Sequence, residues 1–209
     1  MNSVKTSIGW AEWTWNPMIG CYNNCHYCYA RRMNDRFKWI KNWNKPKFFP
    51  ERLIEPYEKK SPAIIFVGSM CDLFGPNVKE EWIYKTIEVA RENPRHTFMF
   101  LTKNPERYID FVFPKNCMLG ITIVDQKAFN RYAETIRHLS LCFKNKLFAS
   151  IEPIQGPFNP DCLHLFDLVI IGAETGRNAP QPSPEWIRSI DHNNIYYKKS
   201  LKHYEATRT

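Results

Sequence analysis

The sequence predicts an α/β domain built on a parallel β-sheet. Short apolar runs rich in Val, Ile, Leu and Phe recur along the chain, at residues 63–67, 97–101, 118–124, 147–151, 168–171 and 195–197. Most of these runs are continuous rather than alternating, as in strands covered on both faces. Helical patterns separate several of them, and strand–helix alternation is typical of a parallel sheet. With a first strand expected at 12–16, the runs are fewer than the eight βα units of a full barrel. A partial barrel and an open doubly wound sheet both fit this pattern.

Four helical segments are predicted between these strands. Residues 79–92 and 126–141 place apolar side chains at intervals of three and four, which indicates one buried helix face. Residues 105–111 and 184–190 are shorter, and each opens with a proline that suits the first turn of a helix. No repeat or flexible linker interrupts the pattern, so residues 1–209 are expected to form a single domain.

The composition excludes several classes of protein. The chain has 209 residues, 44% of them hydrophobic, and its 14 Phe, 10 Tyr and 7 Trp argue against intrinsic disorder. The longest apolar runs, such as residues 168–173, are far shorter than the roughly 20 residues of a membrane span. The N-terminal residues lack the apolar stretch of a secretory signal. We therefore expect a cytoplasmic protein without a membrane partner.

Residues 29–60, here called the basic segment, carry much of the net charge of +8. They hold ten Lys and Arg residues against four acidic ones, interleaved with aromatic residues that include Phe37, Trp39, Trp43, Phe48, Phe49 and Tyr57. Phosphate contacts combined with base stacking use this composition, so nucleic acid is one expected partner. Two alternatives stand beside it. One is an amphipathic helix over 31–43 that packs Phe37 and Ile40 and leaves its charges solvated. The other is an acidic protein partner.

Polar residues directly follow the predicted strands, at 68–72, 102–104, 122, 152–153 and 172–176. The carboxyl ends of parallel strands form the functional site in such folds, although turns and helix caps use the same residue types. Lys103 and Glu152 are the hardest to explain as turn formers, because a charge beside a buried strand is costly unless it is paired or used.

Three of the seven cysteines lie in a loop over residues 20–30, here called the cysteine loop. Cys71, Cys117, Cys142 and Cys162 are scattered and are expected to act as small hydrophobic residues. The other three have the spacing C-x3-C-x2-C, which suits a shared metal centre better than disulfides. Structural zinc usually takes four ligands, whereas three ligands with an open position are typical of a reactive centre. Unligated cysteines and a structural zinc remain the alternatives.

Cys21-x3-Cys25-x-Tyr27-Cys28 resembles the signature of radical S-adenosylmethionine (SAM) enzymes, in which an aromatic residue precedes the third cysteine. The wider sequence is similar to the phage-associated three-cysteine-motif family, a radical-SAM-like group of largely unknown function. The stretches that carry this similarity are 12–17 (EWTWNP), 28–32 (CYARR), 66–74 (FVGSMCDLF), 96–98 (HTF), 101–107 (LTKNPER), 152–153 (EP) and 170–176 (IIGAETG).

The resemblance implies a partial TIM-type (β/α)6-like barrel, the radical SAM core. It implies that Cys21, Cys25 and Cys28 each hold one iron of a [4Fe–4S] cluster, and that the fourth iron binds SAM. One-electron reduction by a flavodoxin- or ferredoxin-like donor would cleave SAM to methionine and a 5′-deoxyadenosyl radical. The resemblance does not name the substrate, and the composition of the basic segment makes a nucleic acid or nucleotide one candidate class. A protein partner encoded nearby is also implied by the resemblance. The alternative function is a non-catalytic metal-stapled module that binds nucleic acid or a protein partner.

The resemblance also assigns roles around the cluster. The residues expected to bind SAM are Tyr27, Gly68, Ser69, Thr122 and Glu152. The candidate catalytic residues on the substrate side are Lys103, Asp72 and Glu174. The stretch between residues 190 and 195 is shorter than in relatives, so the resemblance does not say whether the strand at 195–197 completes the barrel.

Overall fold

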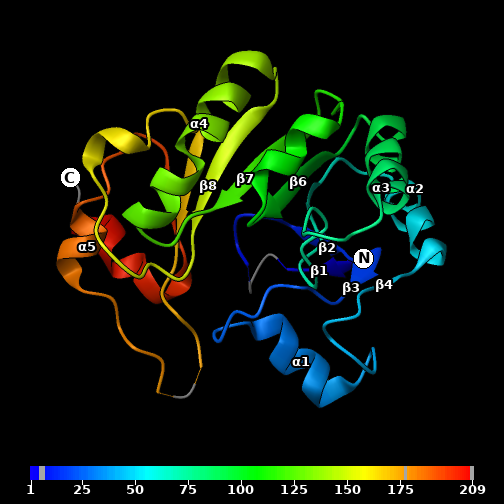
Figure 1. Cartoon of the computed structure of the whole chain (residues 1–209), viewed down its shortest axis with the longest axis horizontal. Helices are drawn as coiled ribbons and strands as arrows, with labels where there is room; N and C mark the ends of the chain where they lie inside the picture. Colours follow the sequence, from blue (N-terminus) through cyan, green and yellow to red (C-terminus); the bar gives the residue numbers. More distant parts are fainter. Residues whose placement is uncertain (5–7, 177, 208–209) are drawn as a thin grey trace.

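The computed structural model describes residues 1–4, 8–176 and 178–207. Its main sheet has eight strands in the order β1-β2-β5-β6-β7-β8-β9-β10 (Figure 1). Their bounds are Asn2–Ser3 (β1), Trp13–Trp15 (β2), Ile64–Val67 (β5), Thr97–Thr102 (β6), Cys117–Thr122 (β7), Lys146–Ile151 (β8), Leu168–Ile171 (β9) and Ile195–Tyr197 (β10). β1 pairs antiparallel with β2, and every other neighbouring pair is parallel.

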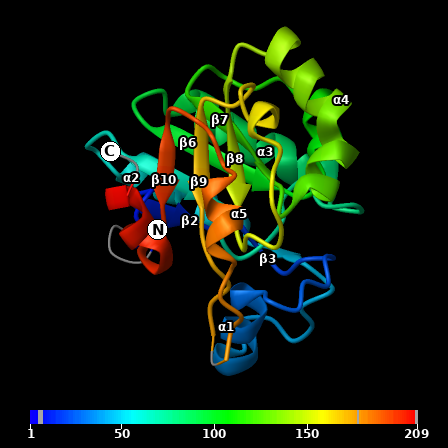
Figure 2. The same cartoon turned by 90° about the vertical axis from the view of Figure 1, so that its left-hand side faces the viewer.

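The strand order decides between the two architectures that the sequence left open. From β2 to β10 the parallel strands follow one another in chain order, without the reversal at a switch point that defines a doubly wound sheet. The sheet curls into a half-barrel, which confirms the partial TIM-type barrel (Figure 2). The six predicted strands and the expected first strand are all present in this sheet. β10 pairs with β9 over three residues and forms the last strand of the sheet.

Side chains of one strand alternate between two cores. Ile65 and Val67 of β5 join the main core beneath the outer helices, whereas Phe66 joins a smaller core on the other face of the sheet. Trp10 fills that smaller core, with its ring 4.7 Å from Phe66 and 5.8 Å from Phe148. The continuous apolar runs in the sequence therefore reflect strands that are buried on both faces.

Two long helices confirm the sequence prediction closely. They are α3 (Glu80–Glu92) and α4 (Gln126–Cys142), and both cover the outer face of the sheet (Figure 1). The predicted segment 184–190 forms the shorter α5 (Pro184–Arg188). The predicted segment 105–111 is a 3-10 helix, Pro105–Asp110, rather than an α-helix. No helix in the described ranges is long and apolar enough to cross a bilayer.

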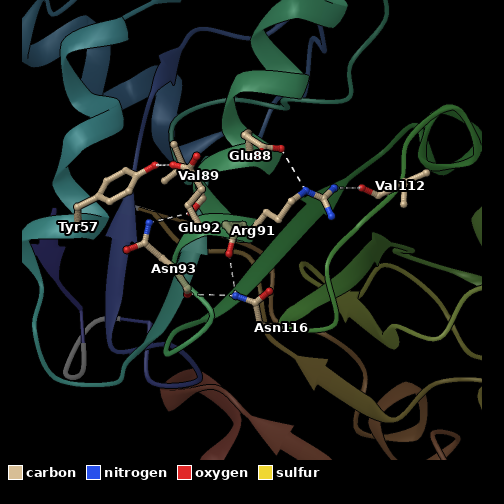
Figure 3. Close-up of polar contacts among 9 residues, drawn as sticks. Tyr57, Glu88, Val89, Arg91, Glu92, Asn93, Val112 and Asn116 are labelled. Atoms are coloured by element: carbon tan, nitrogen blue, oxygen red, sulfur yellow. Dashed lines mark hydrogen bonds and ion pairs between the residues drawn. The ribbon is translucent and has the colours of Figure 1, made fainter.

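A network of side-chain amides ends α3 (Figure 3). Asn116 lies before β7, and its Nδ2 donates to the carbonyl oxygens of Ala90, Asn93 and His96 at 2.9, 3.2 and 3.0 Å. Asn93 is fully buried, and its Nδ2 donates to Val89 O at 2.8 Å. These bonds satisfy carbonyl groups that the end of a helix leaves unpaired.

The predicted helix over 31–43 is wrong in its extent. α1 spans Tyr29–Phe37 and ends where Lys38 adopts a left-handed φ of 55°. The side chain of Asn34 then forms hydrogen bonds with both backbone groups of Ile40. Its Oδ1 accepts from Ile40 N at 3.0 Å, and its Nδ2 donates to Ile40 O at 3.1 Å. Ile40 is buried as expected, but Phe37 is 52% exposed.

Several other short elements were not predicted. β3 (Met18–Ile19) and β4 (Lys47–Phe48) form a two-stranded antiparallel ribbon, and α2 spans Glu55–Glu58. Three 3-10 helices span Pro50–Ile54, Pro160–Cys162 and Lys199–Thr207. The β3–β4 ribbon brackets residues 20–46, so the cysteine loop, α1 and the turn after it form a unit beside the half-barrel (Figure 2).

Candidate functional site

The cysteine loop is attached to the edge of the sheet where the parallel strands end. The N–H of Gly20 donates to Met70 O at 3.0 Å, and Gly20 forms an isolated parallel bridge with Cys71. Residues 68–72 follow β5, so the loop continues the sheet at its carboxyl edge. This edge is where parallel α/β folds carry their functional residues.

The three predicted metal ligands lie on this loop and at the start of α1. Cys21 is buried, and its Sγ accepts the N–H of Asn23 at 3.3 Å. Cys28 is the N-cap of α1, and its Sγ accepts the N–H of Arg31 at 3.3 Å. The N–H of Cys28 donates to Cys25 O at 3.2 Å, which closes the turn between the second and third cysteines. Backbone N–H groups aimed at sulfur favour thiolates and tune an iron–sulfur centre.

Burial opposes the ionisation of Cys21 in the metal-free chain. It raises the pKa of the Cys21 thiol to about 12, with a further contribution from the charge of Asp72 and smaller ones from Cys25 and Cys28. Burial raises the pKa of the Cys71 thiol as well, with further contributions from the charges of Cys21 and Asp72. A metal centre deprotonates its thiol ligands, so binding would release protons here.

Asp72 links the cysteine loop to the end of β6. Its Oδ1 accepts from Thr102 Oγ1 at 2.6 Å, and its Oδ2 accepts from Lys103 N at 3.0 Å and Asn23 Nδ2 at 2.9 Å. Burial raises the pKa of Asp72, and these hydrogen bonds oppose that shift. These hydrogen bonds join the cysteine loop to the end of β6, so Asp72 holds the loop in place.

Lys103 brings a positive charge to the cysteine loop. Its Nζ lies 5.5 Å from the centre of the Tyr27 ring. Burial lowers the pKa of Lys103, whereas the charges of Cys25, Asp72, Cys21 and Cys28 favour its protonated form. An ammonium group among thiolates and a carboxylate offsets part of their mutual repulsion.

The aromatic residues of the loop reach neighbouring segments. Burial raises the pKa of Tyr27, with a contribution from the charge of Cys25 and from a hydrogen bond to it. The hydroxyl of Tyr29 donates to Ser69 O at 2.7 Å. The Tyr29 side chain is half-exposed, but burial at its hydroxyl end raises the pKa of Tyr29, and the charge of Glu152 adds to this.

The segment that follows β9 is held against the cysteine loop and α1. His26 Nε2 lies 3.6 Å from Glu174 Oε2, and Arg32 donates to Thr175 O at 2.8 Å. The structure therefore brings the predicted residue Glu174 beside the loop, through two partners, His26 and Arg32, to which the sequence analysis assigned no role.

The turn after β5 combines a required glycine with an unpredicted asparagine. Gly68 has a φ of 77°, and a Cβ there would lie 2.9 Å from Cys71 Sγ. Asn16 fixes the next two residues, because its Nδ2 donates to Ser69 Oγ at 3.1 Å and its Oδ1 accepts from Met70 N at 2.9 Å. Asn16 has only the position after β2 to mark it in the sequence.

The remaining predicted residues lie farther along the same edge. Glu152 forms an ion pair with Lys198, and both side chains pack against Gly172. Lys198 directly follows β10, and it was missed although the rule of polar residues after strands applies to it. Thr122 is buried at the end of β7, opposite Ser150 of β8.

Three thiols with backbone N–H donors have the ligand chemistry of an iron–sulfur cluster. Among the residues with described positions, no three or more His, Cys, Asp or Glu side chains are grouped so as to hold one metal ion. A mononuclear zinc needs such a convergent tetrahedral set. A [4Fe–4S] cluster takes each thiolate on a different iron, so its ligands need not meet at one point. Three thiols in one loop, with N–H donors and Lys103 beside them, suit this larger group.

Comparison with known proteins assigns the family. Residues 5–200 match the model of a family described as protein of unknown function (DUF5131). The chain belongs to the DUF5131 family. No curated protein matches this DUF5131 chain. Its phage association stays a prediction.

A solved structure shares the fold of this DUF5131 chain. It is a mutant of spore photoproduct lyase, a radical SAM enzyme, with bound AdoMet and dinucleoside spore photoproduct. The TM-score is 0.57 at 15% identity, over 83% of the DUF5131 chain. The DUF5131 chain covers 58% of the length of that structure. At this identity the likeness establishes a shared fold.

Proposed function

We propose that this DUF5131 chain is a radical SAM enzyme in which Cys21, Cys25 and Cys28 hold a [4Fe–4S] cluster. The observation that carries the proposal is the place of the cysteine loop. It lies at the carboxyl edge of a half-barrel that shares the fold of a radical SAM enzyme, and the segments after β5, β6 and β9 contact it. When bound and reduced by an external donor of the flavodoxin or ferredoxin class, such a cluster supplies one electron that splits SAM into methionine and a 5′-deoxyadenosyl radical.

The chain's own residues would hold this centre in place. The N–H groups of Asn23 and Arg31 stabilise the sulfurs of Cys21 and Cys28 as thiolates. Asp72 fixes the loop through Asn23, so we assign it a positioning role. Lys103 keeps a positive charge next to the thiolates, on the side where a substrate would approach.

SAM would lie along the carboxyl edge, as the resemblance implies. Tyr27 borders the cysteines. Gly68 has no side chain, so SAM could approach the backbone of the turn that contains Gly68 and Ser69. Thr122 and Glu152 end neighbouring strands, and Lys198 orients the Glu152 carboxylate. Glu174, held by His26, would close the substrate side.

Iron and sulfide content after anaerobic reconstitution tests the ligand assignment. We expect about four irons and four sulfides per wild-type chain. Cys25→Ala should lose this content, whereas Cys142→Ala should keep it, because Cys142 is an exposed thiol on α4. Equal iron and sulfide in Cys25→Ala and the wild type would contradict the assignment. A colourless protein that retains zinc instead would favour the metal-stapled binding module.

A further inference from the structure

A stacked pair of exposed aromatic rings follows α1. Phe37 is 52% and Trp39 is 42% exposed, yet their ring centres are 5.2 Å apart with planes 24° from parallel. The guanidinium of Arg36 lies 5.1 Å from the centre of the Phe37 ring. Contiguous exposed apolar patches rimmed by polar groups mark interaction sites, and this ring pair beside a cation is a candidate for one.

A turn held by internal hydrogen bonds carries this aromatic pair. Lys38 takes the left-handed conformation and donates its N–H to Asn34 O at 2.6 Å. The buried side chain of Asn34 then holds both backbone groups of Ile40. Because these hydrogen bonds already hold the turn, binding a ligand on the rings would cost little conformational entropy.

A basic hollow adjoins the aromatic pair. Its volume is about 770 Å³, and it is lined by Trp39, Ile40, Lys41, Asn42, Trp43, Lys45 and Lys47. All three lysines are exposed. In the part of the chain that the structure describes, no carboxylate lies within 4.0 Å of any of them. Three cations with no acidic partner there, next to stacking rings, are complementary to a polyanion that carries planar groups.

The hollow and the cysteine loop share one scaffold. Cys21 N donates to Trp43 O at 3.0 Å, and Arg31 bridges Asn24 of the loop and Asn44 of the hollow's rim at 2.6 and 2.8 Å. A small core that contains Ile19, Cys21, Ala30, Ile40, Trp43 and Met70 lies beneath both. A chain bound in the hollow would therefore run directly beside the proposed cluster.

We propose that Phe37, Trp39 and the three lysines of the hollow bind single-stranded nucleic acid. Stacking on exposed rings needs a base whose face is free, which an unpaired strand offers and a duplex does not. The inference deepens the proposed function by naming its substrate class. Strand binding stands without that function, and only the role of the strand as substrate rests on it. The carboxylates of an acidic protein could be drawn to the lysines, but carboxylates do not stack on the ring faces, whereas nucleobases do.

Fluorescence anisotropy with a labelled 12-nucleotide oligothymidylate tests the proposal on the full reconstituted chain. Trp39→Ala should weaken binding by about tenfold, and Trp39→Phe should keep most of the affinity, because base stacking on one ring is typically worth that much. Replacing Lys41, Lys45 and Lys47 together by Gln should lower the slope of log K against log salt by about two, at about 0.7 per phosphate contact.

The matched control replaces Lys115, Lys144 and Lys146 by Gln. These exposed lysines lie at the opposite edge of the sheet, before and at the start of β7 and β8, so the same charge change should leave the slope nearly unaltered. Equal effects of the two triple variants would overturn the proposal. So would unchanged binding by Trp39→Ala, or displacement of the strand by polyglutamate at equal charge concentration, which would indicate an acidic protein partner.

The assay reads binding without SAM or reductant. Cys25→Ala should lose the cluster and still bind the strand, since Trp39 and the lysines are untouched. Failure of strand binding in a protein that cleaves SAM would reject this inference alone. Strand binding by a protein that never takes up iron would reject the proposed function alone.

Discussion

The Asp72 carboxylate shows what single residues contribute to this site and how far a sequence can reveal it. Its position after a predicted strand marked it as a site residue, but its three donors come from the cysteine loop and from β6. Asn16 and Asn23 gave no such signal, because their roles depend on partners about 50 residues away in the chain. Cys21, Cys25 and Cys28 were found because their spacing is local. Local spacing can be recognised in a sequence, whereas long-range side-chain contacts cannot.

His96 provides a prediction about pH. Its ring is buried at the start of β6, with Nε2 donating to Pro56 O at 3.1 Å and Nδ1 without a partner among the described residues. Burial lowers the pKa of His96, and the charges of Arg95 and Lys59 lower it further, whereas backbone hydrogen bonds to Pro56 and Lys59 oppose the shift. The unfolded chain takes up a proton below about pH 6.5 while the folded chain does not.

The free energy of unfolding should therefore fall as the pH drops below about 6.5, by at most about 1.4 kcal/mol per pH unit from this residue. Urea unfolding between pH 7.5 and 5 measures this loss. His96→Gln should reduce it, and the exposed-residue control His203→Gln should not. The same pH dependence in all three proteins would show that His96 does not cause the loss.

At the scale of elements, length decided what could be predicted. The continuous four- to six-residue strands of the sheet and the helices α3 and α4 carry enough periodic pattern to be found. The two-residue strands β3 and β4 carry none, although they bracket the cysteine loop and α1. α1 also ends before its predicted last residue, because the buried side chain of Asn34 forms hydrogen bonds with the backbone of Ile40 and stabilises a turn there.

The amide of Asn116 yields a prediction for α3. It donates to three carbonyl oxygens at the end of this helix and in the turn that precedes β6. Asn116→Ala leaves those carbonyls without this donor and should lower the free energy of unfolding by about 1–3 kcal/mol. Chemical denaturation measures the change, with Asn130→Ala, an exposed position on α4, as the control.

Cluster content should stay at the wild-type level in Asn116→Ala, because Asn116 precedes β7, at the edge opposite the cysteine loop. A loss of iron equal to that of Cys25→Ala would mean that the two ends of the sheet are not independent.

At the scale of the whole molecule, the order of the strands was the feature that residue patterns left open. Strands buried on both faces have the same continuous apolar sequences in a half-barrel and in a doubly wound sheet. Only the pairing of each strand with the next in chain order separates the two. The resemblance carried by the cysteine motif gave the correct choice, and the shared fold with spore photoproduct lyase agrees with it.

The half-barrel also explains why the site residues are dispersed through the sequence. Each βα unit contributes one or two polar side chains at its carboxyl end, from Asn16 after β2 to Lys198 after β10. Residues 20–46 depart from this scheme, because they leave the sheet between β3 and β4 and pack against a small core that includes Cys21, Ile40 and Trp43.

Reductive cleavage of SAM tests the central claim most directly. The reconstituted protein is incubated anaerobically with SAM and dithionite, and 5′-deoxyadenosine is quantified by liquid chromatography. The wild type and Cys142→Ala should form 5′-deoxyadenosine, and Cys25→Ala should form none. A wild-type protein that contains the full cluster and forms no more 5′-deoxyadenosine than Cys25→Ala, with and without the oligothymidylate, would contradict the account.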